Sequence, residues 1–315
     1  MSDSNLTPLN FAITAENFRA IEILLKHISA EDLKLKFGPK AESLIQCSAQ
    51  PYNENIFKTV WRFYQDHNLS IDVNETNNNG ENLPIIALQS FNPHHLDFLF
   101  TETFDQINFN QRDRTGETFT HKFALNQQMK HLELFKKFPK LHAIFNNQIK
   151  IPNNEGKTPM DELVCLYEHD DWINDSNVEA FTEIISFENT RADFHRICVS
   201  SKMACKLLEK FPRILNEMQP DEHLRVLRKA TENPDVYKLL LKKLQSKIAD
   251  TRDVDDKNIL HMICEANSAE LVDFTLKALT KNDAATLRKT LDKETKIPSD
   301  YLDEPNKILF EKCFS

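Results

Sequence analysis

Residues 5–27 read NLTPLNFAITAENFRAIEILLKH, and this stretch decides the fold. Thr7 can cap a helix that starts at Pro8, where the missing N–H costs no hydrogen bond. Two apolar stripes follow at helical spacing, the first at Leu9, Ala12 and Ile13 and the second at Ile21, Leu24, Leu25 and Ile28. Short helices separated by about four residues lie antiparallel. The stretch therefore predicts one antiparallel helix pair.

Three of the chain's four glycines occupy the same place in a repeated phrase. Gly80 lies in NNNGENLPIIAL, Gly116 in RDRTGETFTHKFA and Gly156 in PNNEGKTPMDEL, so they are 36 and 40 residues apart. Each glycine follows polar residues and precedes an apolar helical run, which indicates a tight turn at each place. Self-similarity at this period is typical of proteins built from stacked repeats.

These phrases resemble the ankyrin repeat, in which a motif of roughly G-x-T-P-L-H-x-A starts a first helix and V-x-x-L-L lies in a second. The resemblance is close in residues 5–27 and in EGKTPMDELVCLYE, which VEAFTEII follows. His121 stands at the family's His position in GETFTHKFAL, and the IDVN at 71–74 resembles the family's D-V-N ending. The resemblance implies an all-α solenoid of stacked antiparallel helix pairs that binds a protein on its concave face. An array of tetratricopeptide or HEAT repeats is the rival fold.

The repeated pattern extends over the whole chain as about nine units, so we predict a single solenoid at residues 1–315. The clearest units are residues 5–36, 78–112, 113–150, 153–190 and 255–290, and the weaker ones are 38–75, 191–220, 221–250 and 292–315. The helix starts expected from this alignment are Thr7, Ser43, Asn82, Thr118, Thr158, Ala192, about Leu224, Asn258 and Ile297. A single helix pair has too little interior to fold alone, so each pair buries its faces on its neighbours.

The loop after the first helix departs from the family pattern. Family repeats commonly carry glycine there, whereas this chain has asparagine, at Asn17, Asn92, Asn233 and Asn267. Asparagine is the next-best residue for a left-handed helix terminus. We therefore expect asparagine to replace glycine in this turn.

Phenylalanine is abundant, with 22 copies, and many fall in the expected second helices, at Phe98, Phe100, Phe135, Phe138 and Phe274. We interpret these rings as core packing between repeats. The alternative is an apolar concave groove that takes a helix or strand of a partner.

The sequence carries no motif of catalysis. We find no P-loop, no dinucleotide-binding glycine fingerprint, no GxSxG and no HExxH. His195 and Cys198 could be imagined as a Cys–His dyad, but His195 and His261 stand at the family's His position, which implies a structural role. His195, Cys198 and Cys205 hint at a metal site but lack a fourth ligand. We therefore expect a non-enzymatic protein without cofactor or metal.

The cysteines and one histidine pair have simple interpretations. No CxxC pair occurs, and most cysteines lie in apolar runs, which predicts buried, reduced thiols in a cytosolic protein. The six are Cys47, Cys165, Cys198, Cys205, Cys264 and Cys313. We interpret the adjacent His94 and His95 as a polar helix start and not as a ligand site.

One segment carries all of the net charge of −9. Residues 158–190 hold nine acidic and no basic residues, while the rest of the chain balances with 39 of each sign. Such a field would steer a basic partner and repel nucleic acid, and Trp172 in EHDDWINDSN could anchor that partner. The candidate partner-binding residues are Asp161, Glu168, Asp170, Asp171, Trp172 and Asp175. The alternative is a solvated acidic loop with Trp172 packed on the helices.

Partners and location follow from the same composition. The N-terminal MSDSNLTPLN has no signal-peptide pattern, and no apolar stretch approaches the ~20 residues of a membrane span. We expect a cytoplasmic monomer that binds a protein with a basic surface, but no nucleic acid and no membrane. The basic residues of 225–247 are interpreted as solvated helix faces with salt bridges to neighbouring units. The alternatives are a bacterial effector in a host cytosol, a nuclear protein, and the repeat region of a larger protein.

Overall fold

The computed structural model describes residues 7–29, 32–90, 92–125, 133–168, 175–197, 201–245 and 247–314. Every regular element in these ranges is helical, which confirms the predicted all-α class. One isolated antiparallel bridge joins Phe37 and Glu42. Internal contacts divide the chain into two compact units, Met1–Leu163 and Val164–Ser315, and each is described by itself.

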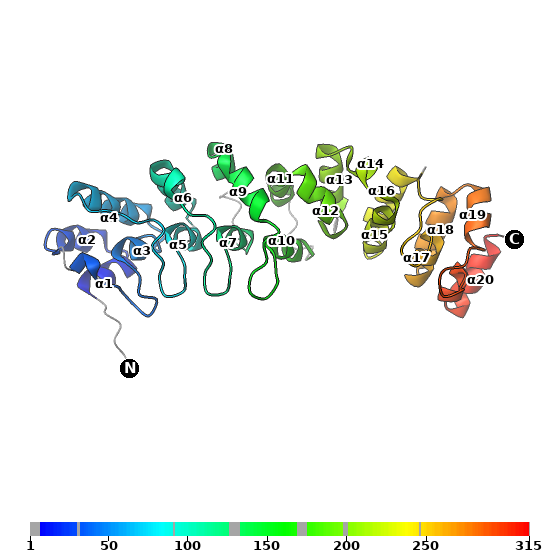
Figure 1. The fold of residues 1–315 in the computed structure, drawn as a ribbon, viewed down its shortest axis with the longest axis horizontal. Helices are drawn as coiled ribbons and strands as arrows, with labels where there is room; N and C mark the ends of the chain where they lie inside the picture. Colours follow the sequence, from blue (N-terminus) through cyan, green and yellow to red (C-terminus); the bar gives the residue numbers. More distant parts are fainter. Residues whose placement is uncertain are drawn as a thin grey trace. The chain divides into compact units, whose positions relative to one another are not determined.

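Unit 1 is a succession of helix pairs (Figure 1). Its α-helices are α1 (Pro8–Thr14), α2 (Phe18–Leu25), α3 (Leu44–Ser48), α4 (Glu54–Asp66), α5 (Leu83–Gln89), α6 (Pro93–Thr103), α7 (Phe119–Leu125), α8 (Glu133–Lys137) and α9 (Lys140–Gln148). Two 3-10 turns, η1 (Asp32–Lys34) and η2 (Phe104–Gln106), add to them, and the unit boundary falls within α10 (Pro159–Glu168). The helices α1, α3, α5 and α7 touch in order, and so do α2, α4, α6 and α8. The pairs therefore form two rows.

Unit 2 repeats this arrangement with different lengths. Its helices are α11 (Asp175–Ile184), α12 (Phe187–Ile197), α13 (Ser201–Lys210), α14 (Ile214–Glu217), α15 (Pro220–Ala230), α16 (Pro234–Leu244), α17 (Ile259–Glu265), α18 (Ala269–Ala278), α19 (Lys281–Leu287), η5 (Pro298–Tyr301) and α20 (Glu304–Lys312). One row of contacts runs through α12, α15, α17 and η5, and the other through α11, α13, α16, α18 and α20.

The helix starts follow cap chemistry. Seven of the nine expected starts are confirmed, because a helix or 3-10 turn begins directly after Thr7, Ser43, Asn82, Thr118, Thr158, Asn258 and Ile297. The starts expected at Ala192 and near Leu224 are wrong. Helix α12 begins at Phe187, where Ser186 Oγ accepts from Asn189 N at 3.2 Å, and α15 begins at Pro220. Both true starts carry residues that cap or open a helix, whereas repeat spacing alone placed the expected ones inside helices.

The asparagines after the first helices are mostly helix caps, which corrects the expectation for three of the four. Asn17, Asn92 and Asn233 have φ of −83°, −107° and −132°, and each side chain accepts a backbone N–H at the start of α2, α6 or α16. Only Asn267 is left-handed, with φ of 50°. An Asn side chain that caps a helix start stabilises the helix by about 1 kcal/mol, and this explains why these asparagines are helix caps and not left-handed residues.

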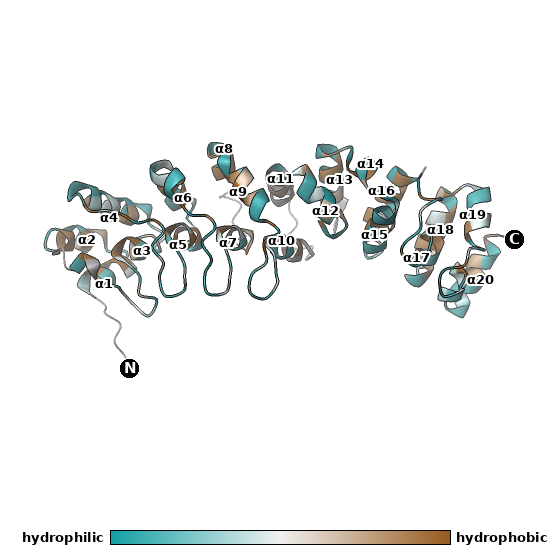
Figure 2. Ribbon diagram, viewed as in Figure 1, coloured by the Kyte–Doolittle hydropathy of each residue, from teal (hydrophilic) through white to brown (hydrophobic). Residues whose placement is uncertain are grey.

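Phenylalanine builds much of the core of unit 1. Phe100 and Phe135 are buried as predicted, while Phe98, Phe138 and Phe274 are half-buried. Phe100 lies edge-on to four rings at centroid distances of 5.4–6.0 Å, those of Phe104, Phe109, Phe119 and Phe138. Hydrophobic residues accordingly concentrate on the helices, and the long turns are hydrophilic (Figure 2). In α2, Ile21 and Leu25 are buried as expected, but Leu24 is only half-buried.

Candidate functional site

Within the described ranges, five turns of five residues share one hydrogen-bond pattern and precede first helices. They span residues 77–81, 113–117, 153–157, 253–257 and 292–296, and we call them the repeat turns. In each, the first residue is Asn or Asp, and its N–H donates to the carbonyl of the fifth at 2.7–3.0 Å. Its side-chain Oδ1 accepts from the N–H groups of the third and fifth residues at 2.8–3.1 Å. A single Asx side chain thus closes each turn locally.

The fourth residue of each repeat turn is left-handed. Gly80, Gly116 and Gly156 have φ of 80°, 80° and 82°, which confirms the tight turns expected at the glycines. Asp256 and Thr295 take the same place in unit 2, with φ of 60° and 62°. The spacing of the glycines could not predict these two turns, because they contain no glycine. The Asx residue three positions earlier was the available sequence signal.

Successive turns are tied together by their backbones. In unit 1, Asn78 N donates to Lys40 O at 2.6 Å, Arg114 N to Asn79 O at 2.7 Å, and Asn154 N to Thr115 O at 2.9 Å. Within unit 2, Lys293 N donates to Asp255 O at 3.0 Å. Because these bonds join turn tips 35–39 residues apart, they fix the spacing of each turn against the next.

Two buried histidines brace this arrangement. His121 Nδ1 accepts from Thr118 N at 3.1 Å, and its Nε2 faces Lys157 O of the next turn at 3.3 Å. His261 repeats both contacts, with Asn258 N at 3.2 Å and Lys296 O at 3.1 Å. The Nδ1 atoms accept, so each ring is neutral with its proton on Nε2. Burial lowers both pKa values, in agreement with the structural role expected for His261.

The fifth residue of the turn, which we call the exit residue, differs in charge along the chain. It is Glu81 and Glu117 in the first two repeat turns, with Glu42 in the corresponding place of the longer turn at 37–42, but Lys157, Lys257 and Lys296 in the later ones. Glu117 pairs with Lys122 and Lys257 pairs with Glu265 at 2.5 Å.

Glu81 is the most enclosed of the paired exit residues. Its carboxylate accepts from Asn77 Nδ2 at 2.9 Å and Gln89 Nε2 at 2.7 Å and lies 3.5 Å from Lys40 Nζ. Burial alone would raise the pKa of Glu81, but these hydrogen bonds and the nearby lysine outweigh it, and the pKa lies below its usual value.

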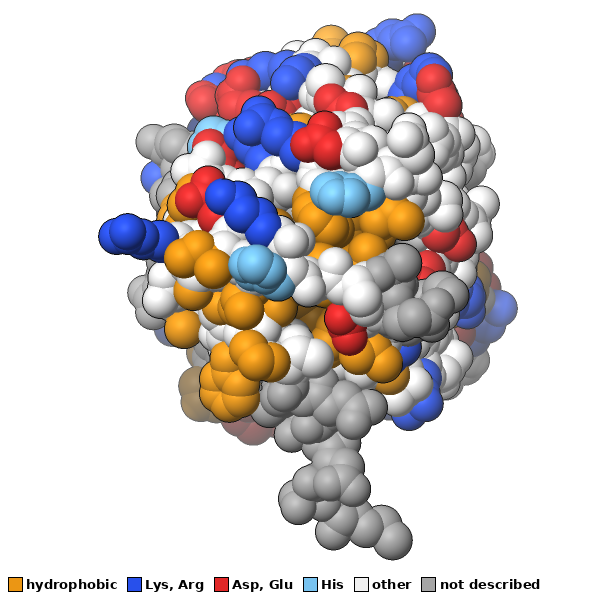
Figure 3. Space-filling model, turned by 90° about the vertical axis from the view of Figure 1, so that its left-hand side faces the viewer, with side chains coloured by type: hydrophobic (Ala, Val, Ile, Leu, Met, Phe, Trp, Pro, Cys, Tyr) orange, Lys and Arg blue, Asp and Glu red, His pale blue; other side chains and the backbone are white. Residues whose placement is uncertain are grey.

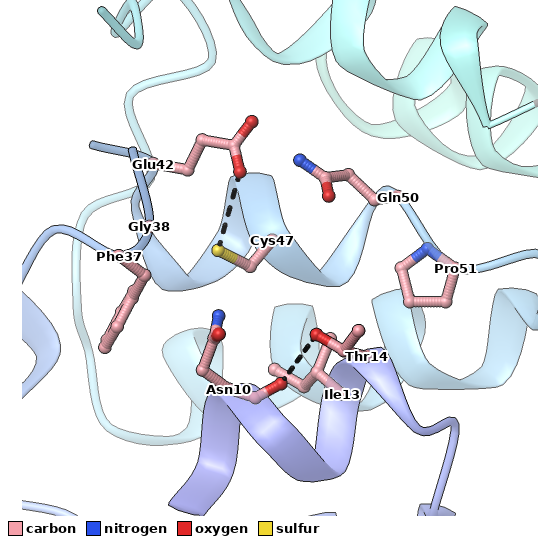
Figure 4. A pocket seen from close by; sticks show the side chains of 9 residues that line it. All are labelled: Asn10, Ile13, Thr14, Phe37, Gly38, Glu42, Cys47, Gln50 and Pro51. Atoms are coloured by element: carbon pink, nitrogen blue, oxygen red, sulfur yellow. Dashed lines mark hydrogen bonds between the residues drawn. The ribbon is translucent and has the colours of Figure 1, made fainter. Parts of the chain in front are cut away.

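A hollow of about 260 Å³ opens beside the longer turn at 37–42 (Figure 4). Asn10, Ile13 and Thr14 of α1 line one side, and Gly38, Glu42, Cys47 and Gln50 line the other. Burial raises the pKa of the Cys47 thiol to about 12, so the thiol stays protonated at neutral pH. The hollow therefore offers a carboxylate, amides and a hydroxyl, but no nucleophile.

Most of the predicted partner-binding residues lie outside the described part. Asp170, Asp171 and Trp172 fall in the gap at 169–174, and the side chains of Glu168 and Asp175 are also outside it. Asp161 is described, and its Oδ2 accepts from Thr158 N at 2.6 Å and from Thr158 Oγ1 at 2.7 Å. Its carboxylate is therefore engaged in capping α10, a role that the capping-box spacing could have indicated.

The remaining candidate residues do not assemble a reactive centre in the described ranges. His195 is half-buried near the end of α12, and Cys198 falls in the gap at 198–200. No group of three His, Cys, Asp or Glu side chains suited to a metal ion occurs among the described residues. Cys47 and Cys264 are buried as expected, whereas Cys205 and Cys313 are exposed.

The interpretation of the histidine pair as a polar helix start is right for one member. His94 is exposed, but His95 is fully buried, with Nδ1 2.8 Å from Ser90 Oγ and its ring edge-on to Phe57. Burial lowers the pKa of His95 to about 4.

The basic residues of 225–247 are largely paired, as expected. Arg228 lies 2.8 Å from Asp253 and 3.6 Å from Glu265, and Lys238 lies 2.6 Å from Glu270 of α18. These pairs connect neighbouring repeats, so the segment is not a free cationic surface.

No family model matches the chain, and no curated protein has a significantly similar sequence. None of the helices in the described ranges combines the length and the apolar character needed to cross a membrane.

Proposed function

We propose that the chain is a non-enzymatic protein-interaction module, an ankyrin-like solenoid that holds a partner protein on the face made by the repeat turns and the first helices. The observation that carries the proposal is the ladder of repeat turns in each unit, tied tip to tip by backbone hydrogen bonds. The resemblance of residues 5–27 and 153–163 to ankyrin repeats supports the same assignment.

The ladder leaves some of the tip side chains free for recognition. Backbone groups and Asx side chains supply most of the bonds that hold each turn, so tip residues outside these bonds can vary without loss of the turn. Exposed tip residues of this kind include Arg114 and Val254, the latter with 75% of its surface exposed, whereas Asn78 Nδ2 donates to Pro39 O at 3.3 Å and Asn154 Nδ2 donates to Arg114 O at 2.9 Å. Side chains presented at regular spacing on fixed loops suit the binding of a folded partner.

The acidic segment at 158–190 supports a partner with a basic surface. Its nine acidic residues carry the net charge of the chain, and such a field accelerates encounter with a cationic protein. The free thiols of the described cysteines support a reducing compartment, so we propose a cytoplasmic location.

Affinity capture with mass spectrometry tests the proposal. The wild-type chain is compared with a triple variant, Asp170→Lys, Asp171→Lys and Asp175→Lys, which leaves the capping Asp161 untouched. The control reverses three exposed acidic residues of the second-helix row in unit 1, Glu22, Asp66 and Glu102. We expect the first variant to lose a saturable partner with unchanged helical content, and the control to retain it.

Two outcomes would contradict the proposal. Equal capture by wild type and both variants would assign the acidic segment to solvation. A purified chain that transfers or hydrolyses a group, with loss of that activity on His195→Ala, would make the protein an enzyme.

A further inference from the structure

The hollow beside α1 and α3 contains a carboxylate that is buried without a cationic partner. Glu42 has only 7% of its surface exposed. Its Oε1 accepts from Asn77 Nδ2 at 3.3 Å, and its Oε2 has only the Cys47 thiol at 4.0 Å. No Lys, Arg or His nitrogen in the described residues lies within 4.0 Å of it. A buried charge left in this state is costly unless a cation compensates it.

The two equivalent carboxylates in unit 1 have such a cation. Glu81 lies 3.5 Å from Lys40, and Glu117 pairs with Lys122. Lys122 stands five residues after Glu117, within α7. The residue five positions after Glu42 is Cys47. Cysteine therefore stands where the repeat of Glu117 has a lysine, and Cys47 lines the hollow.

The lining of the hollow suits the remaining parts of a lysine side chain. Asn10, Thr14 and Gln50 provide oxygen acceptors for an ammonium group, and Thr14 Oγ1 keeps its lone pairs free because its proton goes to Asn10 O at 3.0 Å. Ile13, Phe37 and Pro51 provide apolar surface for the methylene stem. Figure 4 shows Asn10, Cys47 and Glu42 turned toward this common space.

A large exposed aromatic residue follows Asn10, one of the lining residues, in α1. This residue, Phe11, has 63% of its surface exposed. Figure 3 shows that the N-terminal end of unit 1 presents hydrophobic side chains in groups among its charged residues. An exposed ring on the helix that lines the hollow is available as an anchor for the chain that carries the inserted side chain.

We propose that this hollow binds the side chain of a lysine from a partner polypeptide, whose ammonium group pairs with Glu42. Lysine is favoured over arginine because Lys122 makes the equivalent pair within this chain. The proposal rests on the proposed function for the origin of the lysine.

Titration with small amides tests the site directly. The probe is N-acetyl-lysine N-methylamide, and the comparison compounds are the norleucine and arginine analogues. Amide chemical shifts of Gly38, Glu42 and Cys47 in the full-length chain report binding. We expect saturable shifts with the lysine compound and at least about tenfold weaker binding of the norleucine compound, since a charge-assisted hydrogen bond is lost.

Three variants make the test specific. Glu42→Gln should weaken lysine binding about tenfold or more. Cys47→Lys should abolish it without loss of thermal stability, because the new ammonium group can pair with Glu42 as Lys122 pairs with Glu117. Glu117→Gln, the matched control at the equivalent exit residue, should leave binding unchanged.

Unchanged affinity in Glu42→Gln, or equal binding of the norleucine compound, would overturn the proposal. Tighter binding of the arginine compound would overturn the assignment to lysine. The titration contains no partner protein, so its failure is distinguishable from a failure of the affinity capture.

Discussion

The turn at residues 113–117 in unit 1 and the turn at 292–296 in unit 2 have the same backbone hydrogen bonds but differ at the left-handed residue. The first uses Gly116 with φ of 80°, and the second uses Thr295 with φ of 62°. A left-handed β-branched residue is strained, whereas glycine is not. The two turns show that the Asx residue at the start imposes the backbone geometry. Glycine at the fourth position only lowers the conformational free energy of the left-handed backbone.

The comparison extends to the exit residues. In the turn at 113–117 the exit residue is Glu117, which pairs with Lys122, while in the turn at 292–296 it is Lys296, which lies over the ring of Tyr301. The sign of the charge is reversed between these two turns, but both exit residues accept the backbone hydrogen bond that closes the turn. The histidine brace is the part that both units share without change.

The largest expected effect tests the shared brace. His121→Leu and His261→Leu should each destabilise the chain by about 3 kcal/mol, because each removes two buried hydrogen bonds and leaves the buried N–H of Thr118 or Asn258 without an acceptor. Urea unfolding gives the total loss, and hydrogen exchange locates it in unit 1 or unit 2. The exposed His94→Leu is the control. If one histidine variant lost less than half the unfolding free energy that the other lost, the two histidines would not be equivalent in stabilising their units.

The second prediction concerns the space around the glycines. At Gly116 an added Cβ would lie 2.8 Å from Asn154 N, whereas at Gly156 nothing lies within 4 Å. Gly116→Ala should therefore cost about 3 kcal/mol, the sum of left-handed strain and crowding. Gly156→Ala should cost only the strain, about 1 kcal/mol. If both variants lost the same stability in thermal or urea unfolding, steric contact between neighbouring turns would not contribute to the cost at Gly116.

The third prediction is a pH dependence that should be stronger in unit 1. Burial lowers the pKa of His95 from 6.5 to about 4, so between these values the unfolded chain binds the proton more readily. Neutral His95 therefore contributes to the free energy of unfolding. That contribution is complete well above pH 6.5 and falls with the pH, so that about 2 kcal/mol of it is lost at pH 5. His121 in unit 1 and both His195 and His261 in unit 2 act in the same direction, because burial lowers their pKa values too, but the large shift is that of His95 in unit 1.

Hydrogen exchange at pH 7.5 and pH 5 measures this loss in each unit. The variant His95→Gln should have a shallower pH profile, while His94→Gln, a change at the exposed neighbour, should keep the wild-type profile. An unchanged profile in His95→Gln would assign the acid sensitivity to other groups.

The smallest expected effect is a gain. Thr295→Gly removes the strain of a left-handed β-branched residue and should raise the stability by about 1 kcal/mol, reduced by the greater entropy of glycine in the unfolded chain. Asp256→Gly should change it by less, because aspartate tolerates the left-handed region. If both variants lost stability, a side-chain contact rather than backbone strain would govern these turns.

Sequence reasoning succeeded where the signal was local. Thr7, Ser43 and Asn258 were predictable as helix starts because a cap acts within three residues of itself. It failed at Ala192 and near Leu224, where the expected starts came from repeat spacing and not from cap residues. The asparagines show the same limit, since one residue type serves both helix caps and left-handed turns and only the backbone decides between them.

The sequence by itself determined the helical class, most helix starts and the three glycine turns, because these depend on residues within about five positions of one another. Only the tertiary structure decided that His121 braces Lys157, that Glu81 meets Lys40 and that Glu42 meets no cation. These relations join residues about 36–41 positions apart, or depend on the space that a neighbouring helix leaves. Burial and pairing of charge are properties of packing, and no local pattern specifies them.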